Sequence, residues 1–216
     1  MIEDLKKLNF YLKNNNFKKI FIITGINSFN KSGAKQLITK DIIKKTKIYY
    51  KKNLIPEIKE LTKIVTLVKK YEPDIIIAIG GGAVIDYGKI VSIVNNIKNI
   101  KKLIIKNDIP EDKSFPLIAI PTTSGSGAEV TPNAIIYINK TKYTVDKEII
   151  QPNKYFLIPK LTLSGTKKSK ASSGFDAIAQ SIESLLSVRS NKRSVFFATK
   201  SLKYSLRSYI DFVNRP

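Results

Sequence analysis

The sequence predicts an α/β protein with a doubly wound parallel sheet, followed by the start of an all-helical domain. Two observations lead to this fold class. Short apolar runs alternate with amphipathic helical segments over residues 1–160, a pattern typical of parallel strands connected by helices. From Leu161 onward only long helical segments follow. We therefore expect an α/β domain at 1–160 and the first helices of an incomplete all-α domain at 161–216, with little core of their own.

Strands are expected where short apolar runs are bounded by polar residues, glycine or proline. The first is the run Lys-Ile-Phe-Ile-Ile-Thr, which ends at Gly25. Two further runs separated by Asn139-Lys140-Thr141 are typical of a hairpin. The expected strands are 19–24, 48–50, 74–79, 117–121 and 155–158, and the hairpin strands are 134–138 and 142–145.

Helices are expected where apolar residues recur at helical spacing. The clearest covers 56–71, with Pro56 near its start and Pro73 after its end. Ser32 is a candidate N-cap for a helix beginning within 32–39. The other expected helices are 5–12, a segment from the glycines at 80–82 to about 94, and the long segments 173–188 and 194–213.

Composition excludes several kinds of chemistry. The 216 residues include no cysteine and no histidine, so disulfides, thiol catalysis, Ser-His-Asp triads and histidine metal sites are absent from this sequence. No apolar run is long enough to cross a membrane, and the N-terminal residues lack the apolar core of a signal peptide. We expect a cytoplasmic protein that does not act at a membrane.

The formal net charge is +21, from 38 Lys and Arg against 17 Asp and Glu. Such a charge is compatible with nucleic-acid binding, but the lysines are spread along the whole chain and no nucleic-acid motif accompanies them. We do not expect nucleic acid as a partner. A basic cleft for an anionic small molecule remains compatible with the charge.

Three consecutive glycines, Gly80 to Gly82, follow the apolar run at 75–79 and precede a helical segment. Glycine loses more conformational freedom on folding than other residues, so such a run favours a backbone that must approach a ligand closely. A pyrophosphate at a helix N-terminus fits that need. Asp86, one turn into the helix, is expected to hold the loop or contact a nicotinamide-side group. The alternative is a tight structural turn with Asp86 interacting with the helix dipole.

A second loop, residues 121–129, reads Pro-Thr-Thr-Ser-Gly-Ser-Gly-Ala-Glu and also follows an apolar run. Its hydroxyl groups can donate to phosphate and ribose oxygens while its glycines permit close approach. Alone it is equally compatible with a structural turn. Two such loops on two strand ends predict a nucleotide cofactor, and therefore an enzyme.

A third motif, residues 174–183, lies on an expected helix. Asp176 and Gln180 are four residues apart and share one face. This pair is compatible with a metal ligand set or a substrate contact, whereas a cap or a buried network is the more common role of such pairs in general.

Together the three motifs resemble those of the iron-containing (group III) alcohol dehydrogenase family, which is related to glycerol dehydrogenase and dehydroquinate synthase. Residues 80–86 resemble the family's Gly-Gly-Gly-Ser-x-x-Asp, 121–129 its Pro-Thr-Thr-x-Gly-Thr-Gly-Ser-Glu, and 174–178 its Gly-Met-Asp-Ala-Leu. The resemblance implies an NAD(P)- and metal-dependent alcohol dehydrogenase or aldehyde reductase. It also implies a homo-oligomer for a full-length form, acting on a small aldehyde or alcohol.

The resemblance assigns cofactor contacts residue by residue. The expected cofactor-binding residues are Gly25, Ser28, Gly81, Gly82, Ala83, Asp86, Thr122, Thr123, Ser126 and Lys142. Gly25 stands where NAD-preferring members often carry an aspartate against the adenosine ribose. Without that carboxylate a 2′-phosphate is not repelled, and Ser28 or Lys31 could receive it. NADP is therefore expected to bind at least as well as NAD.

The sequence departs from the family at its metal site. The family holds Fe or Zn with one Asp and three His; Asp176 matches the Asp, but Gln180 stands in place of the first His. That glutamine and the residues after it resemble the subgroup that reduces phosphonoacetaldehyde, an anionic phosphonate, to 2-hydroxyethylphosphonate. With the remaining ligands missing, we expect a C-terminally truncated chain with weak or no metal binding and little turnover, and we assign no catalytic residue. The alternative function is a catalytically inactive nucleotide-binding fragment.

Overall fold

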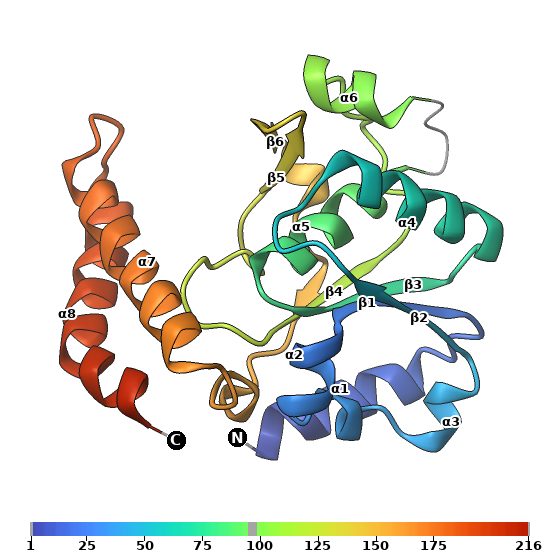
Figure 1. The fold of residues 1–216 in the computed structure, drawn as a ribbon, viewed down its shortest axis with the longest axis horizontal. Coiled ribbons are helices and arrows are strands. Elements are labelled where there is room, and N and C mark those ends of the chain that lie inside the picture. Colours follow the sequence, from blue (N-terminus) through green and yellow to red (C-terminus); the bar gives the residue numbers. More distant parts are fainter. Residues whose placement is uncertain (1, 95–98, 216) are drawn as a thin grey trace.

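A five-stranded, fully parallel sheet forms the centre of the protein. The computed structural model describes residues 2–94 and 99–215. Within these residues the sheet has the strand order β2-β1-β3-β4-β7 (Figure 1). The strands are β1 (Ile20–Gly25), β2 (Thr46–Lys51), β3 (Ile75–Gly80), β4 (Leu117–Pro121) and β7 (Lys154–Tyr155). The predicted α/β fold class is confirmed.

The central strands are buried on both faces of the sheet, which explains why their sequences are nearly continuous apolar runs. Successive side chains alternate between two cores. Phe21 and Ile23 of β1 belong to one cluster of buried residues, whereas Ile20 and Ile22 belong to the other. The same alternation runs through β3. Burial on both faces leaves only the ends of these strands for function.

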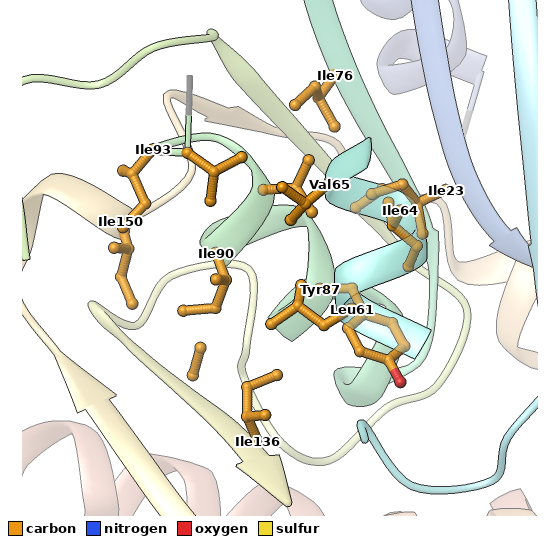
Figure 2. Packing of buried hydrophobic residues seen from close by; sticks show 14 of the residues in the cluster. Ile23, Leu61, Ile64, Val65, Ile76, Tyr87, Ile90, Ile93, Ile136 and Ile150 are labelled. Carbon is orange, nitrogen blue, oxygen red and sulfur yellow. The ribbon is translucent and has the colours of Figure 1, made fainter. Parts of the chain in front are cut away.

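Helices cover each face of the sheet (Figure 1). One side carries α1 (Ile2–Asn14), α2 (Ile26–Lys31) and α3 (Lys40–Ile43), and the other carries α4 (Ile58–Tyr71) and α5 (Gly82–Val91). Figure 2 shows the cluster of buried residues to which Ile23 belongs, where side chains of α4 and α5 meet those of β1 and β3. Ile136 and Ile150, from segments after β4, complete this cluster.

The strand order reverses direction at β1. The chain moves outward from β1 to β2 and then returns to place β3 on the opposite side of β1. In open parallel sheets, ligands bind outside the carboxyl ends of the strands at such a switch point. Here those ends are Gly25 of β1 and Gly80 of β3.

A predicted hairpin and an unpredicted helix lie outside the sheet. Strands β5 (Asn133–Ile138) and β6 (Thr141–Asp146) pair in antiparallel fashion. Asn139 and Lys140 both have positive φ angles, 49° and 67°, as a two-residue type I′ turn requires. Helix α6 (Ile100–Lys106) was not expected; the Asn99 side chain caps it by accepting a hydrogen bond from the Lys102 N–H.

A helix does begin within 32–39, but it is a short 3-10 helix whose N-cap is Gly33, so the expected N-cap role of Ser32 is wrong. Helix α2 begins at Ile26, immediately after β1, and Ser32 is its C-cap. A short 3-10 turn at Ala34–Leu37 and the four-residue α3 fill the segment that follows. The Ser32 hydroxyl donates to the Ser28 carbonyl, and its Oγ atom accepts a hydrogen bond from the Ala34 N–H at 3.2 Å.

The chain ends in two long helices, α7 (Lys167–Leu186) and α8 (Lys192–Asn214), which pack against each other beside the α/β part (Figure 1). The Asn191 side chain forms a capping box with Ser194 at the start of α8. Many large apolar side chains of this pair are exposed, Phe175 and Ile210 among them. Within residues 2–94 and 99–215, no helix combines the length and apolarity needed to cross a bilayer. The domain boundary at 160/161 stays a prediction.

Candidate cofactor site

The glycines expected to approach a ligand form the turn between β3 and α5. Gly80 is the last residue of β3, Gly81 is the N-cap of α5, and Gly82 is its first residue. No side chain caps this helix end, and its first turn contains no acidic residue. Backbone N–H groups and the positive end of the helix dipole are therefore directed at the edge of the sheet, an arrangement that favours an anion.

The hydroxyl-rich loop after β4 packs directly on this glycine turn. The Thr122 N–H donates to the Gly80 carbonyl at 2.9 Å, which continues the β3–β4 ladder into the loops. A Cβ atom on Gly81 would lie 3.2 Å from the Thr123 side chain. A Cβ atom on Gly82 would lie 3.1 Å from Ser126 Oγ. The structure thus brings together Gly81, Gly82, Thr123 and Ser126 from the two motifs.

The end of β1 forms the neighbouring part of this edge, because β1 pairs with β3 up to Thr24 and Ile79. The Ser28 hydroxyl donates to the Gly25 carbonyl at 3.0 Å, and a Cβ atom on Gly25 would lie 2.8 Å from Ser28 Oγ. Gly25 is also the N-cap of α2, without a side-chain cap. No carboxylate stands at this position; Gly25 and Ser28 present a bare backbone and a hydroxyl group.

Asp86 lies on α5 and is nearly buried. Its carboxylate accepts a hydrogen bond from the backbone N–H of Ile135 on β5. Burial raises the pKa of Asp86 to about 7, and the nearby positive charge of Lys89 opposes that rise. The side chain therefore joins α5 to the β5–β6 hairpin, in addition to standing one turn from the glycines.

The raised pKa of Asp86 predicts a pH-dependent stability. Its folded-state pKa lies above the ordinary value of 3.8, so the folded protein holds a proton that the unfolded chain releases. This group's contribution to stability is therefore full below about pH 4 and is lost as the pH rises to about 7. In Asp86→Asn we expect the decline in unfolding free energy across this range to be shallower by up to about 1 kcal/mol per pH unit. Urea titrations at several pH values test this; parallel curves for the two proteins would contradict it.

Lys89 is a residue of this region that sequence reasoning missed. Its side chain is fully buried, and its Nζ atom donates to Thr131 Oγ1 at 3.0 Å and to the Asn133 carbonyl at 2.7 Å. Burial lowers the pKa of Lys89 to about 8, while the negative charges of Asp86 and Glu129 oppose that shift. A lysine three residues after an aspartate, within an otherwise apolar helix, was the available signal.

The remaining expected cofactor residues occupy different surroundings. Ala83 is the second residue of α5 and is half-buried, and Thr122 is buried at the end of β4. Lys142 is exposed on β6, opposite Tyr137, whose N–H donates to the Pro56 carbonyl at 2.7 Å. Lys142 thus lies on the hairpin rather than on either loop.

Asp176 and Gln180 lie on α7, on the helix face that also carries Ser173. The backbone of α7 meets the hydroxyl-rich loop at Ser173, because a Cβ atom on Gly125 would lie only 2.2 Å from the Ser173 carbonyl oxygen. The Gln180 side chain donates to Asp176 Oδ2 at 2.9 Å. Within the described parts of the chain, no three His, Cys, Asp or Glu side chains are grouped so that they could hold a metal ion. Asp176 and Gln180 on their own do not fit the metal site that the resemblance implies.

Comparison with known families decides the relationship. The family described as iron-containing alcohol dehydrogenase matches residues 2–163. This chain belongs to the iron-containing alcohol dehydrogenase family. An alcohol dehydrogenase from Thermococcus barophilus is 31% identical over 156 residues, covering 68% of this chain and 41% of that protein.

Solved structures of an alcohol dehydrogenase and a butanol dehydrogenase have the same fold. An alcohol dehydrogenase from Oenococcus oeni superposes with a TM-score of 0.86 at 27% identity, covering 98% of this chain and 57% of that one. An NADH-dependent butanol dehydrogenase from Thermotoga maritima gives a TM-score of 0.86 at 20% identity, covering 98% and 55%. The chain therefore spans less than two thirds of the length of these relatives.

Proposed function

We propose that this chain binds NAD(P) at the carboxyl ends of β1, β3 and β4, as the nucleotide-binding part of an alcohol dehydrogenase or aldehyde reductase. The observation that carries the proposal is the contact between the glycine turn and the hydroxyl-rich loop, at Gly81–Thr123 and Gly82–Ser126. Uncapped N–H groups and adjacent hydroxyls form one donor surface, which suits a pyrophosphate.

In this proposal, the two loops and the β1 end contact different parts of the dinucleotide. Gly81, Gly82 and Ala83 would receive the pyrophosphate on the N-terminus of α5, with Thr123 and Ser126 beside it. The adenosine ribose would lie at Gly25 and Ser28. We assign the nicotinamide side to the region of Asp86 and Thr122, and we retain Lys142 as a contact from the hairpin. When bound, the cofactor would supply hydride chemistry, and the chain's own residues would position it.

The β1 end predicts the choice between NADP and NAD. Because Gly25 presents no carboxylate, we expect NADPH to bind at least as tightly as NADH. Gly25→Asp should weaken NADPH binding relative to NADH by about tenfold, since a carboxylate beside a 2′-phosphate repels it. The new Cβ atom meets only the end of the Ser28 side chain, which can rotate away.

Fluorescence titrations with NADPH and with NADH give the two dissociation constants and therefore their ratio. Gly25→Asn is the matched control, because it adds a side chain of the same size without the charge. We expect the ratio of its NADPH and NADH dissociation constants to stay within about threefold of the wild-type ratio. A wild-type protein that binds NADH tightly and ignores NADPH would contradict this cofactor assignment.

For the substrate we propose an anionic aldehyde, and specifically a phosphonate such as phosphonoacetaldehyde. The net charge of +21 supports an anionic ligand. Gln180 and the residues that follow it support the resemblance to the subgroup that reduces phosphonoacetaldehyde. We also propose that a full-length form is a homo-oligomer.

The donor set on α7 favours a second candidate function, which is nucleotide binding without turnover. A carboxylate and an amide that bond to each other lack the nitrogen ligands that hold Fe²⁺ or Zn²⁺ tightly. We therefore expect the purified 216-residue chain to carry well under one equivalent of metal and to reduce aldehydes at near-background rates. Elemental analysis and a coupled NAD(P)H oxidation assay test this; stoichiometric metal with robust turnover would contradict it.

A further inference from the structure

One stripe of α5 faces the segment that leads from the hydroxyl-rich loop into β5. Gly82, Asp86 and Lys89 are spaced four and three residues apart, so they share one side of the helix. Gly82 meets Ser126, Asp86 accepts from the Ile135 N–H, and Lys89 donates to Thr131 and the Asn133 carbonyl. Residues 126–135 therefore run along this stripe.

The ammonium group of Lys89 is the only full positive charge that the described residues place on this stripe. A buried charge is costly unless it is paired and hydrogen-bonded. Lys89 meets that requirement with its two hydrogen bonds and with the carboxylates of Asp86 and Glu129 nearby. An apolar side chain would fill the same volume without that cost, so the lysine points to a role beyond packing.

We propose that Lys89 is a positioning residue for the cofactor: its ammonium holds Thr131 and the Asn133 carbonyl on α5, and because this segment directly follows the hydroxyl-rich loop, it fixes that loop against the glycine turn. Both loops contribute to the donor surface at Gly82 and Ser126. A displacement of one against the other would misplace the donors that receive the pyrophosphate, and errors of about 1 Å are enough to weaken binding strongly. The inference rests on the proposed NAD(P) site.

The test is the NADH affinity of Lys89→Met, which keeps the methylene stem and removes the ammonium. We expect the NADH dissociation constant to rise about tenfold. Affinity for AMP, whose adenosine lies at the β1 end, should change less than about twofold. A general loss of structure would weaken both ligands equally, so the difference between them identifies positioning.

Lys113→Met is the matched control. Lys113 is partly buried and, like Lys89, donates two hydrogen bonds, to the Gln151 carbonyl and Asn153 Oδ1, but it lies at the amino ends of β4 and β7. Burial lowers the pKa of Lys113 to about 8, as it does for Lys89. We expect this variant to bind NADH as the wild type does.

Thr131→Val removes one partner of Lys89 and keeps the protein testable if Lys89→Met does not fold. We expect it to weaken NADH binding about threefold, with AMP unchanged. NADH affinity that stays at the wild-type value in both variants, or AMP and NADH weakened equally, would overturn the role of Lys89. A wild-type chain that binds neither ligand would instead overturn the proposed function itself.

Discussion

Gly82→Asp is expected to reduce NADH affinity at least about 100-fold, which corresponds to about 2.7 kcal/mol. Gly82 is the first residue of α5, and its missing side chain lets Ser126 pack against the helix end where we propose the pyrophosphate binds. A carboxylate there would fill that surface and repel the phosphates. Fluorescence titration of NADH against the purified variant measures the loss.

Thr66→Asp is the control for net charge, because Thr66 is exposed on α4 and the variant adds the same single negative charge. We expect its NADH affinity to stay within about twofold of the wild type. Circular dichroism confirms that each variant is folded. A Gly82→Asp protein that is folded and binds NADH normally would refute a pyrophosphate site at this turn.

Gly125→Ala is expected to lower the free energy of unfolding by about 2–3 kcal/mol. Its new Cβ atom would lie 2.2 Å from the Ser173 carbonyl oxygen and 2.9 Å from the Ser173 carbonyl carbon. Both are backbone atoms of α7, so no side-chain rotation relieves the overlap. The hydroxyl-rich loop or the whole helix must shift. Urea denaturation measures the change.

Gly165→Ala is the matched control, since its Cβ atom would have no neighbour nearer than 3.5 Å, an ordinary contact distance. We expect its unfolding free energy to lie within about 0.5 kcal/mol of the wild type. If the two alanine variants were equally stable, the close packing of the loop on α7 would be wrong.

The fold class could be predicted because its strongest signals are local. A parallel strand buried on both faces must be apolar throughout, and the isoleucine runs of β1 and β3 meet that demand. Glycine and proline marked the strand ends correctly. Of the expected strand at 155–158, only Tyr155 lies in β7, whose pairing with β4 covers two residue pairs at the edge of the sheet.

The parts that sequence reasoning missed depend on contacts between distant segments. In the sequence, Lys89 is one lysine among many. Its role becomes visible only in the fold, where Thr131 and Asn133 lie against it. Glu60 is similar: it is buried and accepts hydrogen bonds from the backbone N–H groups of Lys52 and Asn53, beyond β2. The hydrogen-bond partners of Lys89 and Glu60 come from other segments of the chain, so no local sequence pattern predicts them. The two loops themselves were expected from their glycines and hydroxyls at two strand ends, but their direct contact follows from the pairing of β3 with β4.

The central claim is that the edge formed by β1, β3 and β4 binds a dinucleotide. A fluorescence titration of NADH and NADPH with the unaltered 216-residue chain tests it most directly. The chain has no tryptophan, so the nucleotide's own emission reports binding without energy transfer from an indole. We predict saturable binding of one nucleotide per chain, with a dissociation constant on the order of 10 µM. The absence of saturation for both nucleotides up to about 1 mM would contradict the account.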